Sequence, residues 1–463
     1  MTNTTEGRLS TPRSKENRIL RWPVIAWASW DFGSAAFNAV VTTFVFSVYL
    51  VGSSDSPTFI DSAVASEYLS YGMTIAGILI ALLAPITGQR ADRHGKGTLL
   101  LGLNTFAVVA CMVGMFWVYP QSALGPTGAL ILGIALLGLG NVFFEFASVN
   151  YNAMLGRIST PKNMGTISGI GWGSGYVGGI VLLLLLLFAF LGDEPHWFGV
   201  TGENYLNIRS AILLSAVWFA LCAVPVLVTI RGRRYESVEA DECGRESLWQ
   251  SYVLLWGTIK SLYRNDPQTV LFLASSALFR DGLAGVFTFG AIIAKTVFGF
   301  SGSDVLKFAV LANVIAGAAT YLFGWIEDRI GPKRVIMIAL ISMVVCGMMV
   351  FALHDRGAWV FWGFGLVLTA FVGPAQSASR AFLGRLIPEG REGEVFGLYA
   401  TTGRAVSFLA PALYALFLIL GKGISGQQTG YEYWGILGIV LILLAGLLLL
   451  LPVKQDRAHL NHL

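Results

Sequence analysis

The sequence has few charged residues and few residues that could hold a metal. Only 13% of its 463 residues are Asp, Glu, Lys or Arg, whereas soluble proteins average about 25%. Its four cysteines lie far apart without a Cys-X-X-Cys spacing, so no metal site and no disulfide framework is indicated. The formal net charge of +4 is small and its basic residues are dispersed, so nucleic acid is not an expected partner.

Residues that commonly carry out catalysis are also missing from the apolar parts of the chain. The five histidines all fall in loops or in the C-terminal tail, at positions 94, 196, 354, 459 and 462. The glycine-rich stretch 165–179 lies inside an apolar run, and no Lys-Ser or Lys-Thr follows it, so it is not a phosphate-binding loop. We interpret it as a place of close helix packing or as a flexible span. Neither an enzyme nor a bound cofactor or metal is expected.

Apolar residues make up most of the chain. The hydrophobic fraction is 55% and the mean hydropathy is +0.67. A helix needs about 20 apolar residues to cross a bilayer, and twelve runs reach that length. Their cores are 23–51, 68–88, 98–119, 127–155, 165–191, 208–230, 268–298, 305–326, 333–353, 357–384, 393–420 and 431–452. The sequence predicts an all-α integral membrane protein with twelve transmembrane helices in two six-helix halves.

Lys and Arg are divided unequally between the two sides that twelve spans create. If the N-terminus is inside, 23 of them fall on the cytoplasmic side and five on the opposite side. Cytoplasmic loops of membrane proteins carry such an excess of positive residues. We therefore expect a multi-pass protein of the cell membrane with both termini in the cytoplasm.

The same pattern predicts the domain organisation. The N-terminal six-helix bundle covers 23–230 and the C-terminal bundle covers 268–453. The hydrophilic segment 231–267 is predicted to link them, with a short helix along the membrane surface from Leu248 to Leu262. Segments 1–22 and 454–463 are expected to be cytoplasmic tails, and 1–21 lacks the apolar stretch of a signal peptide.

Two short patterns recur in the same order in both halves. The segment 88–97, GQRADRHGKG, recurs at 324–334 as GWIEDRIGPKR. The segment 155–158, LGRI, recurs at 383–386 as LGRL, and in that alignment Gly169 falls on Gly397. An ordered pair of such recurrences indicates a parallel two-fold repeat, in which a substrate site lies between the halves near mid-membrane.

Both copies of the first pattern resemble the signature loop of the major facilitator superfamily, G-X-X-X-D-R-X-G-[RK]-[RK]. Within that superfamily the chain resembles the autophagy-related permease branch, whose fungal members are called vacuole effluxers. The likeness is carried by 26–37, AWASWDFGSAAF, by 150–155, NYNAML, by 279–283, FRDGL, and by 373–380, GPAQSASR. The resemblance implies the major facilitator fold. It also implies that the two signature loops latch neighbouring helices in the outward-facing state, through Gly88, Asp92, Arg93, Gly324, Asp328 and Arg329.

Ionisable residues within the predicted spans are rare, and each is costly enough in lipid to need a partner or a cavity. They are Asp31, Glu145, Arg280, Asp281, Arg380 and Arg404. In the resembling fold, spans one, four, seven and ten line the central cavity, and five of the six residues lie on these spans. We predict that Asp31 and Arg380 pair, directly or through the substrate. The alternative is a permanent structural ion pair.

The other polar residues of the spans leave alternatives open. Glu145 is predicted to carry a proton, or to be a neutral side chain that donates one hydrogen bond between helices. Arg280 and Asp281 point about 100° apart on a helix, so one is expected to face the cavity and the other a neighbouring span. Arg404 is expected to pair with a carboxylate for packing. Asn152 and Gln376 would bind polar ends of a solute or join helices.

The function predicted from these features is secondary active transport of a small polar solute by alternating access. The resemblance suggests amino acids as substrates, and the buried carboxylates suggest a proton as the coupling ion. The predicted substrate-binding or coupling residues are Asp31, Glu145, Asn152, Arg280, Asp281, Gln376 and Arg380. Transport of a sugar, lipid or drug is the alternative. A non-transporting receptor or scaffold is less expected, because 231–266 is short for a soluble domain. The expected partners are the solute, the coupling ion and the lipid bilayer, with the protein a monomer.

Overall fold

The computed structural model describes residues 20–52, 58–93, 95–192, 196–230, 248–387, 391–426 and 431–454. Every regular element in these ranges is a helix, and twelve segments are long and apolar enough to cross a membrane. Both findings agree with the sequence-based prediction. Most of the predicted N-terminal tail, the first part of the linker and nearly all of the C-terminal tail lie outside the described residues.

The first six spans are built as follows. Span one consists of α1 (Trp22–Ala35), η1 (Ala36–Phe44) and α2 (Phe46–Val51), and span two is α3 (Ser62–Arg93). Span three is α4 (Gly97–Gly114) with η2 (Met115–Trp117), and span four is α5 (Gly125–Ala153) with α6 (Leu155–Ile158). Span five is α7 (Met164–Leu186) with η3 (Leu187–Leu191). Span six is α8 (Leu206–Thr229), which follows η4 (Trp197–Gly199) and η5 (Glu203–Tyr205).

The second six spans begin after α9 (Leu248–Asn265), the helix predicted within the linker. Spans seven to nine are α10 (Pro267–Thr296), α11 (Gly302–Ile330) and α12 (Pro332–Ala352). Span ten is divided into α13 (Ala358–Val360), η6 (Phe361–Gly365), α14 (Leu366–Ala370) and α15 (Val372–Leu386). Span eleven is α16 (Glu392–Val406) with α17 (Leu409–Ser425), and span twelve is α18 (Gly435–Leu450), preceded by η7 (Glu432–Trp434).

Spans ten and eleven are broken where the sequence predicts a single span. The breaks fall at Phe371, between α14 and α15, and at Ser407 and Phe408, between α16 and α17. Pro374 and Pro411 follow shortly after the two breaks. A proline cannot donate to the carbonyl four residues earlier, and its ring clashes with that carbonyl. The prolines therefore account for both breaks.

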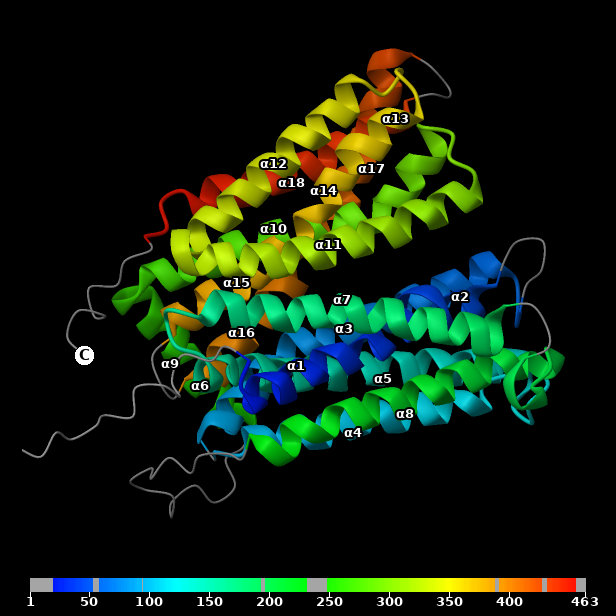
Figure 1. The fold of residues 1–463 in the computed structure, drawn as a ribbon, viewed down its shortest axis with the longest axis horizontal. Helices are drawn as coiled ribbons and strands as arrows, with labels where there is room; N and C mark the ends of the chain where they lie inside the picture. Colours follow the sequence, from blue (N-terminus) through cyan, green and yellow to red (C-terminus); the bar gives the residue numbers. More distant parts are fainter. Residues whose placement is uncertain are drawn as a thin grey trace, which may run out of the picture.

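The two halves meet mainly along two helix pairs, α3 with α16 and α7 with α11, and also along α7 with α15 and α5 with α16. Figure 1 shows the halves converging at the end where α6 and α9 lie and diverging at the end where α2 and α13 lie. Glycines allow the close approach. A Cβ atom added to Gly88 would lie 1.9 Å from the Gly393 carbonyl oxygen, and one added to Gly169 would lie 2.9 Å from Gly324 Cα. Gly169 thus supports the predicted close packing of 165–179.

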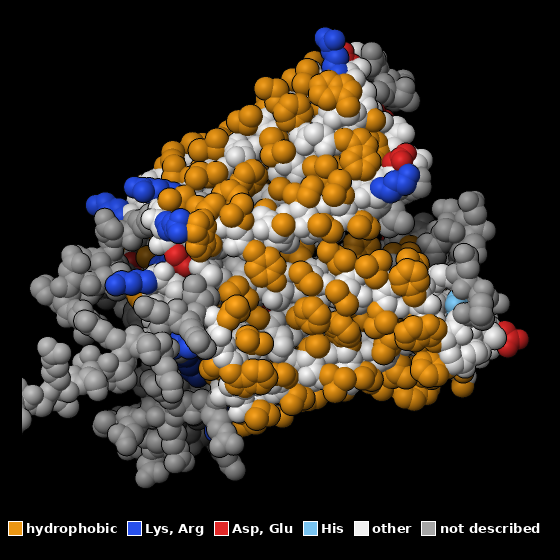
Figure 2. Space-filling view, viewed as in Figure 1, with side chains coloured by type: hydrophobic (Ala, Val, Ile, Leu, Met, Phe, Trp, Pro, Cys, Tyr) orange, Lys and Arg blue, Asp and Glu red, His pale blue; other side chains and the backbone are white. Residues whose placement is uncertain are grey.

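The outer surface matches a lipid environment. Figure 2 shows hydrophobic side chains spread over the sides of both halves, with most of the visible Lys and Arg at the end where the halves converge. Apolar side chains that face lipid cost nothing, whereas in water so large an apolar surface would cause association. The arrangement is that of a multi-pass membrane protein.

Candidate functional site

Asp31 and Arg380 form an ion pair between the two halves. Asp31 lies on α1 and Arg380 on α15, and Arg380 Nη1 lies 3.3 Å from Asp31 Oδ2. Their side chains are only 17% and 5% exposed. The pairing, predicted to be either direct or through the substrate, is direct in the structure, although 349 residues separate the two positions in the sequence.

Arg380 also donates to the N-terminal half at two further places. Its Nη1 donates to Asn152 Oδ1 at 3.2 Å. Its Nε donates to Ser168 Oγ at 3.1 Å, and its Nη2 donates to the Ser168 carbonyl oxygen at 2.7 Å. Asn152 was predicted for this site, whereas Ser168 was not, because a serine in an apolar, glycine-rich span gives no signal of such a contact. The Arg380 guanidinium therefore joins α15 to α1, α5 and α7.

Aromatic rings surround this ion pair. Tyr151 donates its hydroxyl to Asp31 Oδ2 at 2.9 Å, and its ring stacks on Trp27 and on Trp30 at 4.5 and 4.3 Å between centroids. The Arg380 guanidinium carbon lies 4.8 Å from the Trp27 ring centre and 5.7 Å from that of Trp172. Such rings attract a cation and exclude water. The site is a largely dry cluster of one acid, one base and four aromatic side chains.

A glycine on α7 leaves room for the cluster. A Cβ atom added to Gly171 would lie 2.6 Å from Trp27, 2.8 Å from Arg380 Nη2 and 2.8 Å from Asp31 Oδ2. Real Cβ atoms essentially never approach so closely. The stretch 165–179 therefore serves the site as well as helix packing. Trp172, one residue on, has a buried indole N–H without a hydrogen-bond partner.

Glu145 and Arg404 form a second ion pair between the halves. Glu145 lies on α5 and Arg404 near the end of α16, with Arg404 Nη2 2.6 Å from Glu145 Oε1 and 3.3 Å from Asn141 Oδ1. The two side chains are 24% and 30% exposed, so water reaches this pair more readily than the first. The carboxylate partner expected for Arg404 is thus Glu145. Neither alternative proposed for Glu145 anticipated a cationic partner.

Arg280 and Asp281 on α10 both contact the broken span eleven and lie outside the Asp31 cluster. Arg280 Nη1 donates to the Tyr399 carbonyl oxygen at 3.0 Å, and its guanidinium carbon lies 3.7 Å from the Tyr399 ring centre. Asp281 Oδ2 accepts the N–H of Ala410 at 2.7 Å. That N–H belongs to the first turn of α17, where an acidic side chain satisfies a donor left without a helical partner.

Gln376 lies on α15, four residues before Arg380 and hence on the same face of the helix. Its side chain is half-buried. It is thus placed beside the cluster without being part of its hydrogen-bond network.

The predicted gating residues lie where the halves converge. Asp328 accepts the backbone N–H groups of Gly165 and Thr166, each at 2.8 Å, at the start of α7. Asp92 accepts the N–H of Glu394 at 2.9 Å, at the start of α16. Each aspartate therefore binds the first turn of a helix in the opposite half. We call these two contacts the latches.

The other signature-loop residues lie around the latches. Gly88 and Gly324 form the close crossings described above. Arg329 stacks on Trp325, with its guanidinium carbon 3.4 Å from the ring centre, and Arg93 ends α3. Arg385, which the signature loop does not include, lies 3.1 Å from Asp328 and also pairs with the fully buried Glu327. Sequence reasoning missed Glu327, because it lies at the edge of an apolar run.

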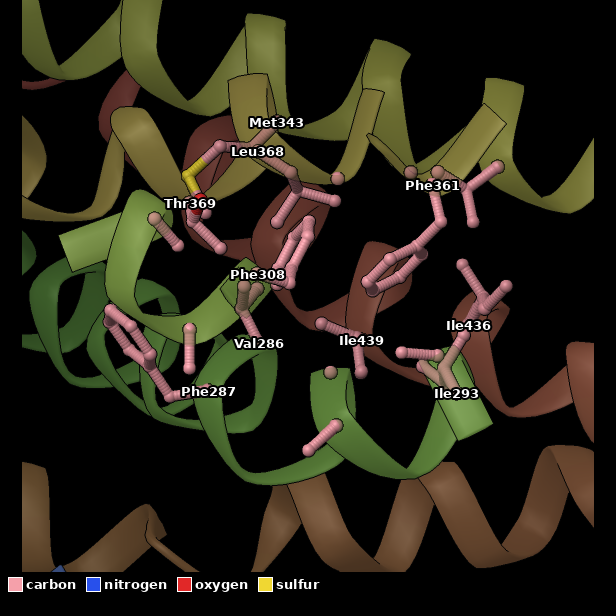
Figure 3. A pocket seen from close by; sticks show the side chains of 18 of the residues that line it. Val286, Phe287, Ile293, Phe308, Met343, Phe361, Leu368, Thr369, Ile436 and Ile439 are labelled. Carbon is pink, nitrogen blue, oxygen red and sulfur yellow. The ribbon is translucent and has the colours of Figure 1, made fainter. Parts of the chain in front are cut away.

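A cavity of about 190 Å³ lies mainly in the C-terminal half, away from the latches, and Thr43 and Phe44 of the N-terminal half also line it. Figure 3 shows its lining, in which Phe287 of α10, Phe308 of α11, Met343 of α12 and Ile439 of α18 are labelled. The lining is almost wholly apolar and includes no charged residue. It could hold an apolar group, and its polar lining residues are Thr43, Asn313 and Thr369. No group of three or more metal-ligating side chains occurs among the described residues.

Comparison with known proteins extends these observations. The family model for vacuole effluxer Atg22-like proteins matches residues 57–462. The uncharacterized MFS-type transporter YxiO of Bacillus subtilis is 23% identical over 94% of this chain and 95% of its own. Autophagy-related protein 22-1 of Neosartorya fischeri is 26% identical over 54% of this chain, but the match covers only 43% of the fungal protein.

Solved structures show the same fold at low sequence identity. The proton:xylose symporter XylE is 13% identical with a TM-score of 0.69, over 92% of this chain and 94% of its own. An outward-facing bacterial homologue of the iron transporter ferroportin is 16% identical with a TM-score of 0.65, over 94% of this chain and 99% of its own. The family match and the twelve spans identify the chain as a transporter rather than an enzyme. It belongs to the vacuole effluxer Atg22-like family of the major facilitator superfamily.

Proposed function

We propose that this transporter moves a small polar solute across the cell membrane by alternating access, coupled to protons. The observation that supports this most directly is the Asp31–Arg380 ion pair, which joins the halves inside a dry aromatic cluster. Separating two buried charges without replacing their partners is strongly unfavourable. A solute that offers its own charged or polar groups to Asp31 and Arg380 would lower that cost. Binding of the solute would then allow the Asp31–Arg380 ion pair to separate.

The latches support the alternating-access part of the proposal. Asp92 and Asp328 hold the halves together at one end, whereas the opposite ends diverge in Figure 1. The excess of Lys and Arg in the loops at the latched end suggests that this end faces the cytoplasm. The structure would then be outward-facing. The six-helix units 23–230 and 268–453 would rock about the cluster, and both termini would be cytoplasmic.

The chemistry of the cluster favours a zwitterionic solute such as an amino acid. Asp31 can accept from an ammonium group, while Arg380 can donate to an acid or an amide. The resemblance to the vacuole effluxers, from which amino acids are the expected substrates, is in line with the same class. Glu145 and Asp31 are the carboxylates we propose for proton coupling, since both lie at the interface of the halves.

Counterflow in proteoliposomes tests the proposal. Vesicles loaded with unlabelled solute receive a trace of the labelled solute, with amino acids and sugars compared, with and without a pH gradient. We expect exchange of one or more amino acids and accumulation only when a gradient is imposed. Arg380→Gln should abolish exchange, whereas Arg356→Gln, at an exposed position, should not. If only sugars are exchanged, the substrate is a sugar and not an amino acid. If no tested solute is exchanged, the protein does not transport these solutes.

A further inference from the structure

The linker helix α9 has a face of aromatic and basic side chains that no other described part of the chain covers. Trp256 and Tyr263 are 69% and 70% exposed. Lys260 and Arg264 are exposed as well, and neither has a hydrogen bond or an ion pair among the described residues. Because these positions follow one another at helical spacing, they lie on one side of α9. We call this side the aromatic–basic face.

Another side of α9 packs on the membrane-spanning bundle. Leu262 is only 5% exposed, and Tyr252 and Ile259 pack against the same buried apolar cluster. The helix contacts α3 of the N-terminal half and α10 of the C-terminal half. These contacts fix the rotation of α9 about its own axis. The aromatic–basic face is therefore held pointing away from the protein.

A hydrogen bond places the first turns of α9 beside the membrane-spanning part of α3. The Tyr252 hydroxyl donates to the Leu82 carbonyl oxygen at 3.0 Å. Leu82 lies eleven residues before the end of α3 at Arg93, about 16 Å along the helix, and its side chain is exposed where the span would face lipid. From Tyr252, α9 runs about 18 Å to Arg264, close to the start of α10.

The direction of α9 follows from these lengths. It runs from the depth of Leu82 toward the end of the molecule that carries the latches, where Figure 1 shows α9. The distance from Tyr252 to Arg264 is about the distance from Leu82 to the end of α3. Lys260 and Arg264 can therefore reach the level at which the spans leave the bilayer. Trp256, one turn after Tyr252, lies deeper.

A bilayer surface attracts this combination of side chains. Trp and Tyr rings gather at the level of the lipid headgroups, and Lys and Arg near that level are attracted to anionic lipids. α9 contains two basic residues and no acidic one. The acid that follows it, Asp266, accepts the Thr269 hydroxyl at 2.6 Å and caps α10. Its carboxylate is thus engaged at the next helix.

The spacing of the two cations suits a phosphate group. Lys260 and Arg264 are four residues apart, so their Cβ atoms lie about 5–6 Å from each other and both side chains can reach one phosphate. A guanidinium binds two phosphate oxygens in parallel, and an ammonium group adds a compact positive charge. A zwitterionic headgroup would bring its own cation to the same place. A headgroup with net negative charge is the better match.

We propose that α9 binds an anionic phospholipid, with the headgroup phosphate between Lys260 and Arg264 and the rings of Trp256 and Tyr263 in the bilayer interface. The partner is a lipid of the leaflet at the latched end. The site lies on the outside of the bundle, separate from the Asp31–Arg380 cluster, and does not depend on which solute is carried.

Native mass spectrometry of the full-length protein in detergent micelles, titrated with phosphatidylglycerol, measures this binding. Phosphatidylcholine with the same acyl chains tests the need for net negative charge, and glycerol 3-phosphate tests whether a free phosphate suffices. The wild-type protein should bind phosphatidylglycerol more tightly than phosphatidylcholine, and glycerol 3-phosphate should not displace the lipid. Lys260→Gln combined with Arg264→Gln should raise the apparent Kd for phosphatidylglycerol about 30-fold, or about fivefold for each basic residue near the membrane surface.

Two further double variants serve as controls. Lys162→Gln with Arg334→Gln removes two exposed cations from the same end of the molecule, one between α6 and α7 and one in the first turn of α12. It should leave the Kd unchanged. Lys260→Arg with Arg264→Lys keeps both charges on α9 and should bind phosphatidylglycerol as the wild-type protein does.

Three results would overturn the assignment. The first is equal affinity of the wild-type protein for phosphatidylglycerol and phosphatidylcholine. The second is equal weakening in the two Gln double variants, which would assign binding to the overall charge of the latched end. The third is displacement of the lipid by glycerol 3-phosphate, which would indicate a free-phosphate site. If Lys260→Gln with Arg264→Gln does not fold, the charge-preserving variant decides, and loss of its preference for phosphatidylglycerol would also overturn the assignment.

Discussion

Asp92 and Asp328, which occupy equivalent positions in the two signature loops, each accept a backbone N–H at the start of a helix in the opposite half. The helices they bind, α16 and α7, are themselves related by the second repeat, in which Thr166 corresponds to Glu394. The signature loop of each half therefore contacts the helix that follows the second repeated motif of the other half. Asp92 accepts the N–H groups of Gly393 and Glu394, as Asp328 accepts those of Gly165 and Thr166. The C-terminal latch is nevertheless the more elaborate, because Asp328 also accepts the Thr166 hydroxyl and pairs with Arg385 at 3.1 Å.

That asymmetry predicts unequal effects of latch mutations. Asp328→Asn removes a charge from several charge-assisted hydrogen bonds, each worth about 1.5–3 kcal/mol, so it should loosen the start of α7. Asp92→Asn should loosen the start of α16 by less. Hydrogen exchange at Gly165, Thr166 and Glu394, followed by mass spectrometry, measures both. Equal loss of protection in the two variants would contradict the asymmetry.

The Asp31–Arg380 pair should show strong energetic coupling. Removing one partner of a buried pair typically costs about 3–5 kcal/mol, because the other charge remains buried. We expect Asp31→Asn and Arg380→Gln each to destabilise by that order, and the double variant by clearly less than their sum. Unfolding free energies of the three variants and the wild type complete the cycle. Additive costs would show that the two side chains do not interact.

Exchanging the two charges should not restore the protein. The Arg380 guanidinium also faces the Ser168 carbonyl oxygen and Asn152 Oδ1, which are both acceptors. A carboxylate introduced there by Arg380→Asp would be repelled by them. The combination with Asp31→Arg is therefore expected to lack both wild-type stability and counterflow, and recovery of either would mean that only the pair itself matters.

Replacing Glu145 should reduce accumulation of the solute without reducing its exchange. Glu145→Gln keeps an acceptor for Arg404 but cannot gain and lose a proton. Counterflow should persist, while the rate of accumulation driven by a pH gradient should fall by about 100-fold or more, the change commonly produced by losing a positioned proton-transfer group. Glu203→Gln, at an exposed position in η5, is the matched control. Normal accumulation in Glu145→Gln would assign the proton to another carboxylate.

The cluster of Glu327, Asp328 and Arg385 should be sensitive to which charge is lost. Two carboxylates share one guanidinium, and Glu327 is only 1% exposed. Arg385→Gln leaves two buried acids unpaired and should cost about 3–5 kcal/mol. Glu327→Gln restores a one-to-one balance and should cost much less. Thermal unfolding in detergent measures both costs, with Arg356→Gln at an exposed position as the control. A larger cost for Glu327→Gln than for Arg385→Gln would contradict this charge balance.

The sequence by itself determined the number of spans, the two-fold repeat and the residues whose burial in lipid is costly. Apolar length and charge are local properties, so the twelve runs and the ionisable residues within them could be read directly. The helix breaks at Phe371 and Ser407 were readable in principle from Pro374 and Pro411. Span-length reasoning passes over them, because a proline in a membrane helix kinks or interrupts the helix without ending the span.

Only the tertiary structure decided which of these residues meet. Arg380 pairs with Asp31 as predicted, but it also binds Ser168, whose role depends on a crossing of α7 with α15 that no local pattern encodes. Arg404 acquired Glu145 as its partner, while Arg280 acquired no carboxylate among the described residues. The physical reason is that composition fixes the cost of placing each charge in the membrane. The packing of distant helices determines whether protein or solute offsets that cost.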